Sequence, residues 1–143
     1  MQIDDLITRL KAEVPEFQGR VEGAAELAAL VKDGRAPNRT PSAYVLPLGL
    51  VATPATTATG VHRQLFTETF GVVIVLTVAN DATGAKGLPK INLLRDAVIQ
   101  KLAGWQPTGA FEAISLRRAV LKSMVKGTIT LQVDFNTDDY LRI

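Results

Sequence analysis

The feature that most constrains the fold is one long segment, HRQLFTETFGVVIVLTVAN, which runs from His62 to Asn80. Its second half, GVVIVLTVA, is almost entirely apolar, yet a membrane-spanning helix needs about 20 consecutive apolar residues. β-branched Val, Ile and Thr dominate this half, and these residues favour a pleated strand over a helix. The segment therefore predicts one long β-strand.

The two halves of this strand predict different surroundings. From Val72 to Leu76 both alternating faces are apolar, which is typical of a central strand covered on both sides. Near the start, Phe66 and Phe70 share a face with Glu68, so this end is expected to be only partly covered. A strand of this length would extend roughly 60 Å at about 3.3 Å per residue. It must either bend or project past its own sheet, and we expect projection, with a boundary near Gly71.

Hydrophobic periodicity places the other elements around this strand. The expected helices cover residues 3–14, 24–33 and 89–103, and the expected strands cover a short piece within 16–23, then 42–50, 113–125 and 128–135. Gly34 and Gly104 follow two of the helices as stops, and Trp105 is expected to pack under the end of the third. The pattern predicts an α/β (α+β) fold in which a mixed, mainly antiparallel sheet packs with about three helices. We expect a single domain over residues 1–143.

Two features of the region before the long strand limit its structure. Pro47 cannot donate a backbone hydrogen bond, so the strand that contains it should lie at a sheet edge or end there. The following residues, VATPATTATG from Val51 to Gly60, are polar and Thr-rich, and they predict a long loop.

The composition excludes several kinds of chemistry. The 143 residues include no cysteine and a single histidine, His62, so disulfides, Cys-ligated metals and His-rich zinc sites are excluded within one chain. Neither a phosphate-binding loop nor a dinucleotide fingerprint is present. Asp138 and Asp139 are adjacent in an extended region, so their side chains should point to opposite faces. We therefore expect no enzyme, no catalytic or metal-binding residue and no cofactor. The acidic start of the chain also predicts no export signal.

A short basic cluster lies near the carboxyl end. Arg117, Arg118, Lys122 and Lys126 fall within ten residues of a predicted hairpin. Such a cluster indicates either a solvated face or weak contact with nucleic acid. Because strand residues alternate between faces, Arg117 cannot share a face with Arg118 and Lys122.

An ordered set of sequence blocks carries a family resemblance. RVEGAAELAAL is followed by AYVLPLG, then by TGVHRQLFTETFGVVIVLTVAND, and then by LLRDAVIQKLAGWQP. In this order and spacing, which covers roughly Val14 to Pro107, the chain resembles the tail terminator proteins of long-tailed bacteriophages and prophages. The terminal hairpin agrees in kind.

The resemblance implies a structural virion protein. Such a protein forms a homo-hexameric ring on the head-proximal end of the tail tube, stops tube polymerisation and provides the surface to which the neck joins. The implied partners are further copies of the chain, the tail tube protein and a neck or head-completion protein, with DNA passing through the ring and no membrane. The implied location is the virion tail, and the host cytoplasm during assembly.

Under this reading the first half of the long strand and the preceding loop become interface candidates. We expect HRQLFTETF to reach toward a neighbouring subunit and the Thr-rich loop to become ordered on contact with a subunit or the tube. The candidate residues for these contacts are Thr53, Thr56, Thr57, His62, Arg63, Gln64, Phe66, Glu68 and Phe70. Arg118 and Lys122 are candidates for facing the lumen and its DNA.

Two alternatives stay open on the sequence alone. A head-completion or neck connector protein would also form a ring. A small ligand-binding α/β regulatory domain would instead enclose a pocket with convergent polar groups.

Overall fold

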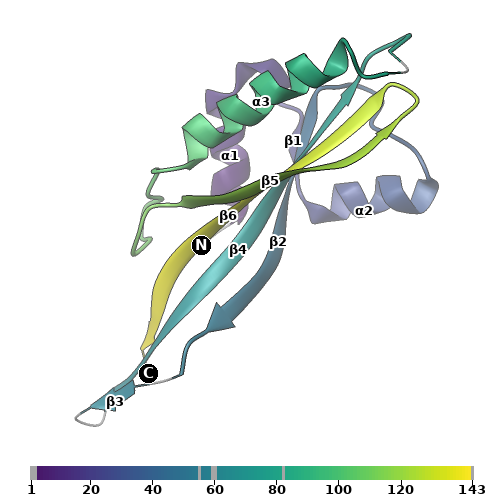
Figure 1. The fold of residues 1–143 in the computed structure, drawn as a ribbon. Coiled ribbons are helices and arrows are strands. Elements are labelled where there is room, and N and C mark those ends of the chain that lie inside the picture. Colours follow the sequence, from purple (N-terminus) through teal and green to yellow (C-terminus); the bar gives the residue numbers. More distant parts are fainter. Residues whose placement is uncertain (1–2, 55, 59–60, 82, 143) are drawn as a thin grey trace.

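One long sheet runs the length of the molecule and positions every other element (Figure 1). We analysed a computed structural model, which describes the backbone of residues 3–54, 56–58, 61–81 and 83–142 and the side chains of residues 3–54, 63–81 and 83–141. The strands lie in the order β1-β2-β4-β6-β5, and β3 also pairs with β4. β1 is parallel to β2, whereas all other pairs are antiparallel, so the predicted mixed, mainly antiparallel α+β fold is confirmed.

The element bounds follow the predicted order closely. The helices are α1 (Ile3–Glu13), α2 (Ala24–Asp33) and α3 (Gly87–Leu102), with a short 3₁₀ helix at Pro15–Phe17. The strands are β1 (Val21–Glu22), β2 (Ser42–Ala52), β3 (Thr56–Ala58), β4 (Val61–Thr77), β5 (Ser115–Val125) and β6 (Thr128–Arg142).

Local chemistry explains the helix ends. Gly34 adopts φ 65° at the end of α2, and its N–H donates to the carbonyls of Leu30 and Val31, which confirms the predicted stop. At the start of α3 the buried Asp81 carboxylate accepts hydrogen bonds from the N–H groups of Lys86 at 3.0 Å and Gly87 at 2.7 Å. These donors would otherwise lack a partner, so Asp81 caps the helix although it precedes it by several residues.

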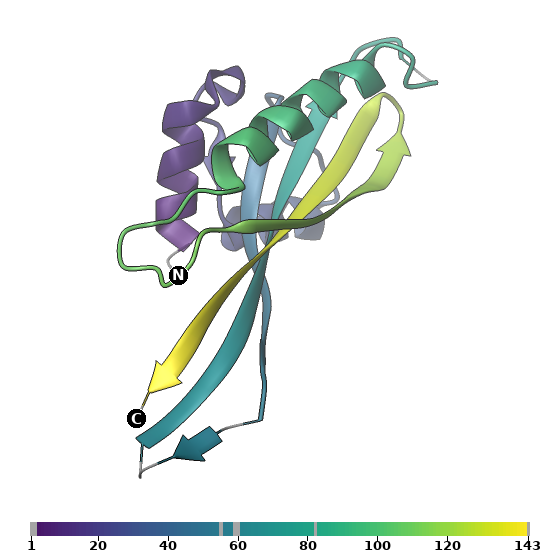
Figure 2. The ribbon, with the colours of Figure 1, turned by 60° about the vertical axis from the view of Figure 1, so that its left-hand side comes forward.

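α1 and α3 cover one face of the sheet, and α2 covers part of the other (Figures 1 and 2). The larger core joins Leu6 and Leu10 of α1 to Ile91 and Val98 of α3 through Ile74 of β4. Its members include Trp105, which packs against this core after the end of α3 as predicted.

A second, smaller core lies on the α2 side. Val73 and Val75 of β4 pack with Tyr44 of β2 and with Leu27 and Leu30 of α2. The prediction that the second half of the long strand is covered on both faces is therefore confirmed.

The lower half of the sheet extends beyond all three helices (Figures 1 and 2). We call this part the ribbon and define it as residues 48–52 of β2, 61–69 of β4, 136–142 of β6 and the short strand β3. The prediction that β4 projects past its own sheet is wrong, because β2 and β6 extend with it and pair along its length. β4 projects past the helices that cover the sheet, and not past the sheet itself.

Two predicted boundaries change for the same reason. The strand expected to end at Phe135 continues to Arg142, paired throughout with β4. Part of the loop expected from Val51 to Gly60 is paired as well, because β2 reaches Ala52 and Thr56–Ala58 forms β3 against β4. In both segments the exposed backbone of β4 supplies hydrogen-bond partners that extend the ladder.

β2 forms an outer edge of the sheet beyond Tyr44, where its pairing with β1 ends. The predicted edge position of Pro47 is thus confirmed, whereas the alternative that the strand ends there is wrong. Ala43 donates its N–H to Arg20, away from β4, and alternation gives the nitrogen of Pro47 the same outward direction. The register with β4 then shifts between Pro47 and Gly49, and β5, the opposite edge, has two such shifts.

Candidate assembly interface

Most of the predicted interface residues lie on the ribbon. Thr53 is tied to β4, because both its N–H and its hydroxyl donate to the carbonyl of Leu65, at 2.9 Å and 3.0 Å. Gln64 donates from Nε2 to the carbonyl of Thr53 at 2.6 Å, and the Arg63 guanidinium lies 4.2 Å from the Tyr140 ring centroid. These contacts hold the end of the ribbon as an ordered surface in the free chain.

Phe66 and Glu68 line a hollow where the ribbon meets the helical layer. They lie on the side of the sheet that also carries the larger core, opposite Asp139 and Thr137 of β6. The hollow has a volume of about 220 Å³, and Asp5 of α1 and Phe111 of the loop before β5 complete its wall. Both predicted residues are half-buried, so they are only partly available to a partner.

Phe70 is not an interface residue of the folded chain, which corrects its place among the candidates. Its side chain is 0% exposed and stacks on Phe135 of β6 with ring centroids 5.3 Å apart. It belongs to the larger core because α1 and α3 already cover the sheet at this level. We call the part of the molecule in which helices cover the sheet the body. The boundary between body and ribbon therefore falls just before Phe70, close to the predicted position at Gly71.

The remaining three candidates are placed by backbone alone. Thr56 pairs with Arg63 and Thr57 with His62 where β3 meets β4. The side chains of Thr56, Thr57 and His62 lie outside the described residues, so their role in contacts stays a prediction.

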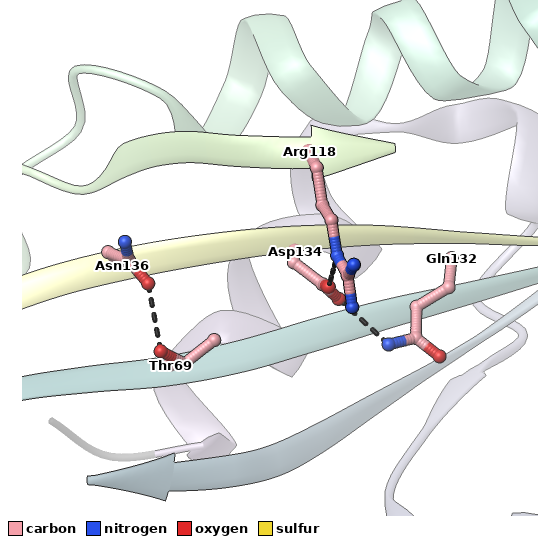
Figure 3. Close-up of polar contacts among 5 residues, drawn as sticks. All are labelled: Thr69, Arg118, Gln132, Asp134 and Asn136. Atoms are coloured by element: carbon pink, nitrogen blue, oxygen red, sulfur yellow. Dashed lines mark hydrogen bonds and ion pairs between the residues drawn. The ribbon is translucent and has the colours of Figure 1, made fainter. Parts of the chain in front are cut away.

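A polar ladder holds the other face of the ribbon. Thr67 donates to the Asp138 carboxylate at 2.6 Å. Thr69 donates to Asn136 Oδ1 at 2.8 Å (Figure 3). Each pair joins β4 to β6 directly across the sheet. Such cross-strand pairs stabilise a sheet where no apolar layer covers it.

The ladder ends at a buried carboxylate, Asp134. Its side chain is 1% exposed, and it accepts hydrogen bonds from Arg118 Nε at 2.9 Å and Gln132 Nε2 at 2.8 Å (Figure 3). Gly71 lies opposite Asp134, and a Cβ there would meet the carboxylate at 3.1 Å. The glycine within an otherwise apolar run was the available signal for this close approach.

This network decides the role of Arg118. Its guanidinium is bound to the buried carboxylate, so its charge is largely neutralised and it is a weak candidate for contact with DNA. Lys122 lies on the same side of the sheet and lines a groove beside α2. The lumen-facing role of Lys122 stays a prediction.

A groove beside α2 brings the predicted residue Lys122 together with apolar side chains. It has a volume of about 460 Å³ and runs between α2 and the exposed sheet face. Leu30 and Val31 of α2 form one wall, and Val73 and Val75 of β4 form the floor. Sequence reasoning missed this groove, because α2 shows only that one of its faces is apolar and not how much of the sheet it leaves uncovered.

Comparison with protein families supports the resemblance noted in the sequence. A family model described as phage tail terminator protein matches residues 1–143. The chain belongs to the phage tail terminator family. This membership makes it a structural protein of phage tails, which is the coarser part of the predicted function.

Solved structures of similar fold include a chain of the virion of a native gene transfer agent particle. The two chains share 14% sequence identity, with a TM-score of 0.57, and the similarity covers 93% of this terminator and 90% of that chain. At this identity the likeness supports the fold. Comparison with curated proteins finds no match.

A second recess bears on the ligand-binding alternative. It has a volume of about 490 Å³ and also borders α2, and its lining includes Arg20, Arg35, Arg39, Glu22 and Glu26 beside Tyr44. Burial raises the pKa of the Tyr44 hydroxyl, and the charge of Glu22 adds to this effect. Groups of both signs line this recess, so the ligand-binding alternative stays open.

Within residues 3–54, 56–58, 61–81 and 83–142, no helix is long and apolar enough to cross a membrane. Among the same residues, no group of three or more His, Asp or Glu side chains is arranged to hold a metal ion.

Proposed function

We propose that this terminator forms a homo-hexameric ring on the head-proximal end of the tail tube, stops tube polymerisation there and presents a surface to the neck. The ring and the capping role come from the family resemblance. The observation that carries the proposal is the ribbon, a rigid sheet extension that no helix covers. Its exposed residues include Leu50, Val51 and Leu141, which contribute little to the fold of the free chain.

The ribbon suits contact with another protein because its backbone is already ordered. Cross-strand pairing and the Thr67–Asp138 and Thr69–Asn136 contacts fix its shape. A partner therefore binds without a large loss of conformational entropy. A binding role of this kind needs no catalytic residue.

DNA passage is part of the same proposal. A channel must let the genome through, so only weak, sequence-independent contact with phosphate is useful. The neutralisation of Arg118 by Asp134 is consistent with such weak contact.

The test is tube capping by purified protein. Terminator is added to growing tail tubes, and tube length is measured by electron microscopy against tubes grown without it. Capping predicts shorter tubes with a ring at one end, and deletion of the gene predicts overlong or unstable tails. Tubes of unchanged length and normal tails would contradict the proposal.

A matched pair of variants connects this activity to the ribbon. Phe66→Asp places a charge in the hollow beside Glu68, whereas Leu93→Asp places one on α3, where the side chain is 71% exposed. Both variants should fold, and only Phe66→Asp should lose capping. A neck connector, the second candidate, would bind filled heads and leave tube length unchanged.

A further inference from the structure

The groove beside α2 is an apolar surface without an occupant in the chain itself. Its walls and floor are formed by Leu27, Leu30, Val31, Val73 and Val75, and the Val31 side chain is 72% exposed. α2 packs mainly against β2, so the sheet face toward β6 and β5 is left open beside it. The floor residues Val73 and Val75 are each only 5% exposed, so the apolar surface offered to a partner is mainly Val31, with Leu27 and Leu30 beside it.

The rim of this groove is basic. Lys122 of β5 lines one side and Arg35, just after α2, lines the other. Arg118 is bound to Asp134, and Arg35 pairs with Asp33 at 3.5 Å, so Lys122 carries most of the basic charge of the rim. No carboxylate lines the groove among the described residues, so it favours an apolar segment that carries acidic side chains.

The ribbon of the same chain has this chemistry. On one of its faces Leu50 is 55% exposed and Leu141 is 43% exposed. The strand register places Glu68 and Asp139 on this same face, whereas Val51, Asp138 and Arg63 lie on the opposite face. The face with Leu50 and Leu141 therefore matches the groove in apolar character and opposes it in charge.

One chain cannot bring these two surfaces together. β4 runs unbroken from the floor of the groove at Val75 into the ribbon at Thr69, paired with a neighbour on each side. The ribbon cannot fold back without breaking this sheet. Contact between ribbon and groove must therefore involve two copies.

We infer that the ribbon of one copy docks in the α2 groove of the next copy. The two surfaces are different, so the contact is head-to-tail and can close into a ring. The inference rests on the proposed ring and names the surfaces that join its subunits. In this contact Lys122 faces a neighbouring subunit and not the lumen of the ring.

The absence of cysteine from the sequence permits a direct test by cross-linking. Val31→Cys is made in one preparation and Leu50→Cys in a second, and the two are mixed, with and without tail tubes, before a short bismaleimide is added. Docking predicts a covalent dimer in the mixture but not in either preparation alone. Leu93→Cys on α3 is the matched control, since it is as exposed as Val31 but lies on the other side of the sheet.

Charge variants in the same assay test the rim. Lys122→Glu should lower the yield of the Val31–Leu50 dimer by about fivefold, whereas Arg117→Glu, on the same strand but not lining the groove, should change it by less than about twofold. A dimer yield no higher than that of the Leu93→Cys control would overturn the inference. So would a dimer from Leu50→Cys alone, or a link from Val31→Cys to the tube protein.

The two proposals fail in different ways. Rings that cap tubes without the Val31–Leu50 dimer would overturn the docking contact and leave the capping role intact. The dimer without any effect on tube length would support the docking contact and overturn the capping role.

Discussion

The two ends of β4 lie in different surroundings although they belong to one strand. From Phe70 to Leu76 every side chain is buried, between α1 and α3 on one face and α2 on the other. From Arg63 to Thr69 the same strand has no helical cover, and its described side chains are exposed or half-buried. The first part is held by apolar packing, and the second is held by pairing with its neighbours. The comparison teaches that strand length alone does not show where a core ends.

The largest expected effect separates the two aromatic residues on either side of this boundary. Phe70→Ala leaves a cavity beside Phe135 and should lower the free energy of unfolding by about 3–5 kcal/mol. Phe66→Ala truncates a half-buried ring of the ribbon and should lower it by about 1 kcal/mol. Urea denaturation of both variants measures the difference. Equal losses would show that the ribbon shares the core of the body.

The next effect concerns the dynamics of the two ends. Backbone amides of residues 72–76 should exchange with solvent only through global unfolding, because helices cover both faces there. Amides of residues 65–69 should exchange through local opening, with protection lower by on the order of 100-fold. Hydrogen exchange followed by mass spectrometry or NMR measures this ratio. Uniform protection along β4 would contradict the division.

A smaller effect is expected at the junction between the ends. Arg118→Ala removes one hydrogen bond from the buried Asp134 carboxylate and should lower the free energy of unfolding by about 1–2 kcal/mol. Arg117→Ala is the matched control on the same strand and should change it by less than about 0.5 kcal/mol.

A double-mutant cycle checks the origin of that loss. In an Asp134→Asn background the buried charge is gone, so Arg118→Ala should have a smaller effect. An undiminished effect would show that Arg118 contributes through packing instead of through the carboxylate.

The smallest effect is a dependence on alkaline pH in the body. Burial raises the pKa of Tyr44 above its ordinary value of 10.0, so the unfolded chain loses this proton first as the pH increases. The contribution of Tyr44 to stability is fully present below about pH 10 and is lost as the pH rises through the folded pKa. Tyr44→Phe should flatten this part of the profile, measured as the urea midpoint between about pH 9 and 11. An unchanged slope would show that the neutral hydroxyl gains nothing from its position.

The sequence predicts most of the fold because its strongest patterns are local. The apolar run after Gly71 indicates a strand covered on both faces, and helical spacing places all three helices. The end of β6 was missed because residues such as Asp138 and Asp139 have low strand propensity. They are paired because β4 lies beside them, which is a tertiary effect that no local pattern contains.

The candidate site is predicted only in part for a related reason. Thr53, Arg63, Gln64, Phe66 and Glu68 lie at or beside the ribbon, as the alternating pattern suggests. Phe70 has the same spacing but lies under the helices, and spacing does not show where helical cover begins. The groove beside α2 depends on how helix and sheet pack, so only the structure shows it.

The outer edge of β2 also affects how free copies behave before they meet a tube. Exposed strand edges are templates on which other chains can add strands and aggregate. Pro47 offers no N–H on this edge, and the register shift at Gly49 interrupts the row of groups that a new strand would need. β5, at the opposite edge, carries Arg117, Arg118 and Lys122, and Lys126 follows it in the turn. Its pairing with β6 also has two register shifts. A protein from a family that terminates tails is thereby hindered from growing into fibres of its own.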